Sequence, residues 1–512
     1  MSSQIEALSS ARALASGIGW NALGRGLPVV VALVTTPFLL HHLGIERWAL
    51  FTLALSVAGS FGIFDFGIGA ALTRALAERI GTPAERESAP IIVVALTVLV
   101  LTGSVGAALA WVATPWAMQR FLHVPPALRL EAIDAFRVLC LSGPLIIVNS
   151  ALWGVLSAFQ KFRVVILSNI PVSILYYAGP TTALLVSHSF VLVIATLVAA
   201  RLMQAAICGA IVLRLVPDLR RRPHLELRRL RPLLRIGAWV TVSNILWPLM
   251  LYVDRFVVGT MLPLAAVSYY ATSLDLVVRL MMVPLAISAV LFPAVATSYR
   301  TMPERACRLL RHSLLPTVAV VFPACVLLTG FARELLSLWL GAGFANDSQT
   351  IVVIFAVGTF LSCIAQLPGT LTDAAGRPEI GAIILLVQAV LFPPIIVLMI
   401  WRFDITGAAV TWMLRAAINF AVRLLVCRQL GAMAAPIVPG LWVVGIIGVT
   451  ALAACWLTGP VPLRVAVMAS AAIGVPLLAG ALLLDASEIA QVRQAMRRSM
   501  MRLLAARPAW LT

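Results

Sequence analysis

Long apolar runs recur along almost the whole chain and alternate with short polar segments. Each run has about 20 residues, enough for a helix rising about 1.5 Å per residue to cross a hydrocarbon core of about 30 Å. A segment that spans lipid must satisfy its own backbone hydrogen bonds, and these runs are too long and continuous for strands of a barrel. The pattern therefore predicts an all-α polytopic membrane protein.

About fourteen transmembrane helices are predicted. The eighth is longer than one span requires, which predicts an extension into the cytoplasm. The fourteen ranges are 15–39, 48–72, 89–113, 132–157, 164–186, 189–213, 236–259, 264–298, 313–330, 349–374, 380–400, 406–427, 437–457 and 465–484.

Composition leads to the same class. Of the 512 residues, 61% are hydrophobic and only 11% are charged, which excludes an ordinary soluble domain. The first twenty residues lack the basic start, short apolar core and small-residue cleavage site of a signal peptide, so they are expected to stay on the protein. The seven cysteines are scattered through the apolar runs and are interpreted as small core residues; neither metal nor cofactor is expected.

The net charge of +18 follows from topology. If the N-terminus is cytoplasmic, most arginines fall in the segments facing the cytoplasm, above all in the linker 214–235. The positive-inside rule then predicts that both termini lie in the cytoplasm. The protein itself is expected in the inner (cytoplasmic) membrane. No nucleic-acid partner is predicted.

A weak internal repeat predicts two parallel-related six-helix bundles followed by two extra helices. Residues 19–56 and 238–275 share a shift of 219 positions that superposes Trp20 on Trp239. The expected domains are an N-terminal lobe (1–213), a basic cytoplasmic linker (214–235), a C-terminal lobe (236–430), two extra helices (431–484) and a basic amphipathic cytoplasmic tail (485–512).

Seven arginines fall inside the predicted spans, where a charge at the bilayer centre costs at least about 2.5 kcal/mol. Such residues usually face a bundle interior or a water-filled cavity. Arg25, Arg201, Arg279 and Arg415 lie near the middle of the membrane. The other three are close enough to a membrane face to snorkel, and these are Arg137, Arg255 and Arg423.

Carboxylates within the spans are the second set of candidates. Asp275 precedes Arg279 by four residues, a spacing that allows an ion pair on one helical face. Asp254 and Arg255 are adjacent, so one of them is expected to point at a cavity or its rim. Asp65 lies near the cytoplasmic end of the second predicted helix.

The second helix and its surroundings, "LGIERWALFTLALSVAGSFGIFDFGIGAALTRALAE" (43–78), resemble polysaccharide and lipid-linked oligosaccharide flippases of the O-antigen and capsule exporter type. "YVDRFVVGTMLPLAAVSYYATSLDLVVRL" (252–280) and "VLFPAVA" (290–296) resemble the corresponding elements of the second half. These flippases belong to the multidrug/oligosaccharidyl-lipid/polysaccharide exporter superfamily. The resemblance covers at least residues 15–430.

The resemblance implies movement of a polyprenyl-diphosphate-linked oligosaccharide across the cytoplasmic membrane, by alternating access around a cationic central cavity, for surface polysaccharide synthesis. Arginine suits this substrate because its planar donor fork matches phosphate oxygens. The expected substrate-binding residues are Arg25, Arg279, Arg201 and Arg415. Asp65, Asp254, Arg255 and Asp275 are the expected gate or ion-coupling residues, and Gly62, Gly67 and Gly69 allow close helix approach beside Asp65.

Expected partners are the lipid-linked glycan, membrane lipids, and a polysaccharide polymerase with its chain-length machinery. Two alternatives are a drug/cation antiporter of the same superfamily and a peptidoglycan lipid-precursor flippase. Drug exporters of this superfamily commonly carry an acid in helix 1, where this chain has Arg25, and that departure favours an anionic substrate. A membrane enzyme is disfavoured because no large outer loop displays catalytic carboxylates or histidines.

Overall fold

The computed structural model describes residues 11–82, 88–221, 230–299, 301–429, 437–457 and 459–484. For residues 11–25, 162–166, 220–221, 230–245 and 378 it describes the backbone alone. All regular elements within these ranges are helical, which confirms the all-α prediction. The predicted cytoplasmic tail, 485–512, lies outside the described residues.

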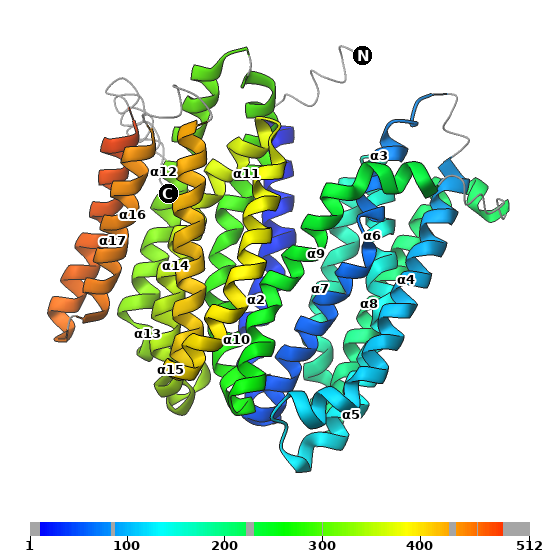
Figure 1. Ribbon diagram of the computed structural model, residues 1–512, viewed down its shortest axis with the longest axis horizontal. Coiled ribbons are helices and arrows are strands. Elements are labelled where there is room, and N and C mark those ends of the chain that lie inside the picture. The colour runs from blue at the N-terminus through cyan, green and yellow to red at the C-terminus, as the bar shows by residue number, and fades with distance from the viewer. Residues whose placement is uncertain are drawn as a thin grey trace, which may run out of the picture. The chain divides into compact units, whose positions relative to one another are not determined.

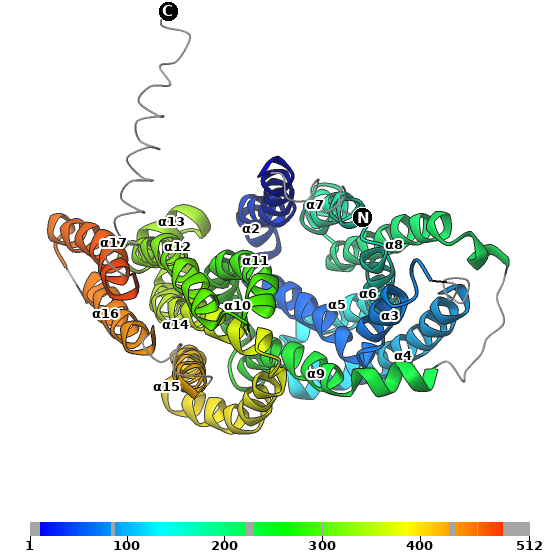
Figure 2. The ribbon, with the colours of Figure 1, turned by 90° about the horizontal axis from the view of Figure 1, so that it is seen from above.

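The described chain packs as two compact units. The first comprises Met1–Thr272 with Ala382–Ala408, and the second comprises Ser273–Gly381 with Ala409–Thr512. Helices α3, α4, α6 and α8 cluster side by side in the first unit, as Figure 2 shows from above. The helices that begin in the first unit are α2 (Ala11–Ser60), α3 (Ile68–Ala77), α4 (Ser88–Trp116), α5 (Pro126–Cys140), α6 (Ser142–Ala158), α7 (Phe162–Val186), α8 (Phe190–Leu215), α9 (Leu230–Met261) and α10 (Leu264–Val278).

In the second unit α12 packs against α11, α14, α16 and α17. Met468 of α17 lies directly against Gly330 of α12, where a Cβ atom would meet its sulfur. The helices that begin after residue 281 are α11 (Met282–Ser298), α12 (Pro303–Gly330), α13 (Ala332–Leu340), α14 (Ala342–Ala374), α15 (Pro378–Gln429), α16 (Ile437–Leu457) and α17 (Val461–Leu483).

Each of the fourteen predicted runs overlaps a helix, but several boundaries differ. The first two runs join as α2 and the eleventh and twelfth join as α15, each through a single non-helical residue, Gly44 (φ 73°) and Asp404 (φ 57°). The blue helix α2 of Figure 1 reverses direction along its length, and the one non-helical residue within α2 is Gly44. Glycine adopts this positive φ without the steric penalty of a side chain. Ten helical segments among the described residues are long and apolar enough to cross a membrane.

The fourth and eighth runs are interrupted. The fourth is divided between α5 and α6, and the eighth is divided by a short 3-10 segment, η6 (Arg279–Met281), between α10 and α11. A matching 3-10 segment, η1 (Phe61–Asp65), interrupts the second run. The breaks at Gly44 and Pro263 are 219 positions apart, and η1 and η6 are separated by nearly the same shift. The helix breaks therefore follow the internal repeat, while the boundaries of the five expected domains stay a prediction.

Candidate functional site: buried charges within the apolar helices

Asp65 ends the first transmembrane hairpin. Helix α2 stops at Ser60, and Phe66 and Gly67 adopt left-handed conformations before α3 starts at Ile68. The Oδ1 atom of Asp65, whose residue is 7% exposed, accepts a hydrogen bond from the amide of Gly69 at 3.0 Å. The second helix was predicted to continue through residue 72, and the two left-handed residues end it earlier. Asp65 therefore satisfies an amide that the first turn of α3 would otherwise leave without a partner.

Asp254 and Arg255 are both buried, with 5% and 4% of their surface exposed. Although adjacent on α9, they bind different neighbours. The hydroxyl of Tyr270 on α10 donates to Asp254 Oδ2 at 3.3 Å, and Arg255 Nη1 donates to Ser56 Oγ on α2 at 3.3 Å. Successive residues of a helix point about 100° apart, which lets α9 contact two helices at this level.

The side chain of Arg255 is buried and reaches across to α2. It lies six residues before the end of α9, and Ser56 lies twelve residues beyond the turn at Gly44. The guanidinium thus reaches a level of α2 about 18 Å from that turn, at a rise of about 1.5 Å per residue. It also lies 5.7 Å from the ring centroid of Tyr252, one turn earlier on α9. The expectation that Arg255 snorkels to a membrane face is not met, because hydrogen-bonding and aromatic partners are available inside.

Close packing holds α9 and α10 against α2 around this cluster. A Cβ atom on Gly59 would lie 2.4 Å from Tyr252 Oη, so the tyrosine occupies the space above that glycine. Trp48 Nε1 donates to Thr272 Oγ1 at 2.7 Å, and Ser268 Oγ donates to the carbonyl of Ile45. These contacts bring helices that are about 200 residues apart in the sequence into one polar cluster.

Arg201 belongs to a second polar cluster, between α6, α7 and α8. Its Nη1 donates to Gln204 Oε1 at 3.1 Å, and Gln204 Nε2 donates to Asn169 Oδ1 at 3.1 Å. The guanidinium carbon lies 5.0 Å from the ring centroid of Tyr176. Asn149 Nδ2 donates to the carbonyl of Arg201 at 3.1 Å. Within the described residues, Arg201 is therefore held by neutral groups.

Two atoms of this cluster have no partner among the described residues. They are Nε of Arg201, a donor, and Oδ1 of Asn149, an acceptor on a residue that is 5% exposed. A buried polar atom without a partner costs about 1–3 kcal/mol. The packing of α6, α7 and α8 therefore leaves one donor and one acceptor of this cluster buried without a hydrogen bond.

The remaining mid-membrane arginines are less closely defined. The side chain of Arg25, on α2, lies outside the described residues. Arg279 starts η6 and is partly exposed. Among the ion pairs of the described residues none joins it to Asp275. Arg415 lies partly buried on α15.

Arg137 and Arg423 are partly buried, and each contacts other side chains of the protein. The guanidinium carbon of Arg137 lies 4.4 Å from the ring centroid of Trp111. Arg423 Nε donates to Asn419 Oδ1 at 3.2 Å, and its Nη1 covers Gly369, where a Cβ atom would overlap it. No group of three His, Cys, Asp or Glu side chains that could hold a metal ion occurs in the part of the chain that the structure describes.

Sequence reasoning identified the charged residues but missed the neutral ones that hold them. Ser56, Tyr252 and Tyr270 were not singled out, nor were the three amide side chains of the Arg201 cluster. A usable signal was present, since Asn149, Asn169 and Gln204 all interrupt apolar runs, where polar side chains usually bond across helices.

Comparisons with known proteins agree with this architecture. A putative O-antigen transporter of Shigella flexneri is 25% identical over 409 residues, which are 78% of this chain and 94% of that protein. A probable low-salt glycan biosynthesis flippase, Agl15 of Haloferax volcanii, is 25% identical over 190 residues, which are 37% of this chain and 40% of that protein.

Two solved structures share the fold. An inward-facing multidrug resistance transporter of the MATE family, in the MOP superfamily, has a TM-score of 0.63 at 16% identity, covering 85% of this chain and 99% of that one. The lipid II flippase MurJ has a TM-score of 0.65 at 11% identity, covering 90% and 97%. The family described as "Polysaccharide biosynthesis protein" matches residues 14–298. The chain belongs to this polysaccharide biosynthesis family and has the all-α fold of the MATE and MurJ transporters.

Proposed function

We propose that this protein is a flippase that moves a polyprenyl-diphosphate-linked oligosaccharide across the cytoplasmic membrane, for synthesis of a surface polysaccharide. Family membership and the likeness to an O-antigen transporter over most of the chain support this substrate class. The lipid-linked glycan is the partner that follows directly. Coupling to a polymerase and to chain-length machinery is a further part of the proposal.

The observation that carries the proposal is the charge of Arg201. It lies eleven residues into α8, at a depth of about 17 Å, near the middle of a hydrocarbon core of about 30 Å. It is partly exposed, and its contacts in the described residues are neutral. A fixed guanidinium cation suits a phosphate oxygen, whereas it repels the cationic substrate of a drug exporter.

The other substrate-binding candidates, Arg25, Arg279 and Arg415, keep that role in the proposal. Alternating access would bring the diphosphate past these fixed charges from the cytoplasmic side to the outer side. The proposal includes an inner-membrane location with both termini in the cytoplasm. The arginine-rich linker 214–235 supports this orientation.

Reconstituted transport tests this function. The full-length protein in liposomes should move a labelled polyprenyl-diphosphate glycan from one leaflet to the other, measured by access of an external glycan-modifying enzyme. Arg201→Gln removes a charge-assisted contact of about 1.5–3 kcal/mol and should slow flipping by roughly tenfold or more. Arg201→Lys keeps the charge without the planar fork, so it should restore the rate only in part.

Arg464→Gln is the matched control. Arg464 bonds to Glu334 near one end of α17 and packs on Phe331, so the change removes the same charge away from the Arg201 cluster. All variants are compared at equal reconstituted protein levels. Transport of a cationic dye without transport of the lipid-linked glycan would contradict the proposal and favour the drug/cation antiporter.

A further inference from the structure

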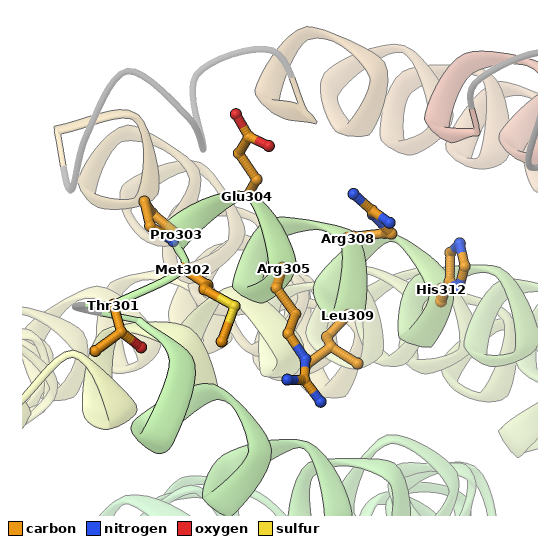
Figure 3. Close-up of a pocket in the computed structure, with 8 residues that line it drawn as sticks. All are labelled: Thr301, Met302, Pro303, Glu304, Arg305, Arg308, Leu309 and His312. Carbon is orange, nitrogen blue, oxygen red and sulfur yellow. The ribbon is translucent and has the colours of Figure 1, made fainter.

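A cavity of about 660 Å³ lies at the beginning of α12, outside both polar clusters described above. Figure 3 shows its lining residues, which come from the turn before α12 and from the first three turns of that helix. They are Thr301, Met302, Pro303, Glu304, Arg305, Arg308, Leu309 and His312. The volume is within the range of about 300–1,000 Å³ typical of small-ligand sites.

Cationic side chains dominate the polar part of this lining. Apart from Pro303, the helical members of the set fall within an arc of about 140° at 3.6 residues per turn, so these five lie on one face of α12. Arg305, Arg308 and His312 lie on this face with a single acid, Glu304. Glu304 and Arg305 point to opposite sides in Figure 3, and no ion pair among the described residues joins them.

The ligands of this cavity are side chains rather than helix amides. The N–H groups of Arg305 and Ala306 both donate to the carbonyl of Met302, so the first turn of α12 already uses them. An anion in the cavity would therefore be bound by guanidinium groups, which form two-pronged hydrogen bonds with phosphate oxygens.

The position along α12 indicates which anion is available. Residues 314–330 form the apolar part of this membrane span, about 25 Å long at 1.5 Å per residue. His312 and Arg308 precede it by about 3 and 9 Å, which places them at the level of the lipid headgroups that flank a hydrocarbon core of about 30 Å. Leu309 and Met302 add an apolar side to the same cavity.

We propose that the cavity at the start of α12 binds the phosphate headgroup of an anionic phospholipid, with Arg305 and Arg308 as its main ligands. Basic pockets beside transmembrane helices are suited to such headgroups on the cytoplasmic side of a membrane. This binding anchors the start of α12 at the membrane surface. It is independent of the proposed transport substrate and requires no movement of the lipid across the membrane.

The test compares lipids on the full-length protein purified in a neutral detergent. Phosphatidylglycerol should raise the midpoint of thermal unfolding more than phosphatidylcholine does. Arg305→Gln/Arg308→Gln should reduce that difference by at least half. The control Arg377→Gln/Arg428→Gln removes the same charge from two exposed arginines outside the cavity and should leave the difference unchanged.

A second measurement is independent of the stability of the variants. Native mass spectrometry should show fewer phosphatidylglycerol molecules retained by the double variant, and by Arg305→Gln alone, than by the parent or the control. Equal retention in all four proteins would overturn the proposal. Sodium phosphate in a third arm should have little effect, and a stabilisation equal to that of phosphatidylglycerol would show a site for soluble anions in place of a lipid site.

Discussion

The guanidinium of Arg255 on α9 donates a hydrogen bond to the hydroxyl of Ser56 on α2, across 3.3 Å. Both residues are buried, and their positions in the sequence differ by 199. The bond lies beside the Tyr252 ring and next to the bond between Tyr270 and Asp254. A buried charge contributes to stability only when such partners surround it, since its desolvation is otherwise uncompensated. The cluster therefore couples α2, α9 and α10.

Ser56→Ala removes one acceptor from the buried guanidinium. The free energy of unfolding should fall by about 1 kcal/mol or more, because hydrogen bonds to charged groups are among the stronger ones. Thermal unfolding of the purified protein measures this. Ser60→Ala is the control one turn further along α2, where the hydroxyl bonds only to the local carbonyl of Ser56 among the described contacts. Equal losses for the two variants would show that the Arg255 bond adds nothing.

Gly59→Ala should destabilise the same interface by packing alone. The added Cβ atom would lie 2.4 Å from Tyr252 Oη and 2.5 Å from the ring, so the tyrosine must move away. Overpacking of this kind costs about 1–3 kcal/mol. Gly62→Ala is the matched change three residues later, where no atom would lie within 4 Å. A midpoint of thermal unfolding for Gly59→Ala that equals that of Gly62→Ala would contradict this account of the interface.

Two substitutions of Asp65 distinguish a structural role of its side chain from a role as a gate. Asp65→Ala leaves the Gly69 amide without its acceptor and should cost about 0.5–2 kcal/mol, the usual effect of losing a helix cap. Asp65→Asn keeps an acceptor oxygen and should cost about 0.5 kcal/mol or less. Flipping by Asp65→Asn should therefore stay near the parental rate. If Asp65→Asn folds normally and fails to transport, its negative charge is needed and the gate role is supported.

The orientation of the helices is predicted by the arginine distribution and can be read with reporter fusions. Fusions after Lys161, between α6 and α7, and after Arg311 should report cytoplasmic locations. Fusions near Val124, between α4 and α5, and near Asn346 should report the outer side. The reporter signals of all four fusions are compared in one host strain at equal expression levels. Reversed signals at three of the four positions would contradict the predicted topology.

The apolar pattern was sufficient for the fold class, the approximate helix positions and the location of charges within the membrane. Length and continuity of apolar runs depend only on the chemistry of lipid as a solvent, which acts on each segment separately. The helix break at Asp65 could not be predicted from the apolar pattern. The left-handed conformations of Phe66 and Gly67 depend on local backbone energies, and the length of an apolar run carries no information about these energies. The run continued through residue 72, while the helix ended at Ser60.

The partners of the charged residues were decided by tertiary structure. Nothing in the sequence neighbourhood of Arg255 indicates Ser56. The amides of the Arg201 cluster stand out in their apolar runs, but the sequence does not show that Gln204, Asn149 and Tyr176 would contact Arg201. Such contacts depend on how each helix is rotated and tilted against its neighbours, which is set by the packing of many side chains together. The sequence alone therefore determined which residues carry charge into the membrane, and the packing of the helices determined which of those charges are held by neutral partners.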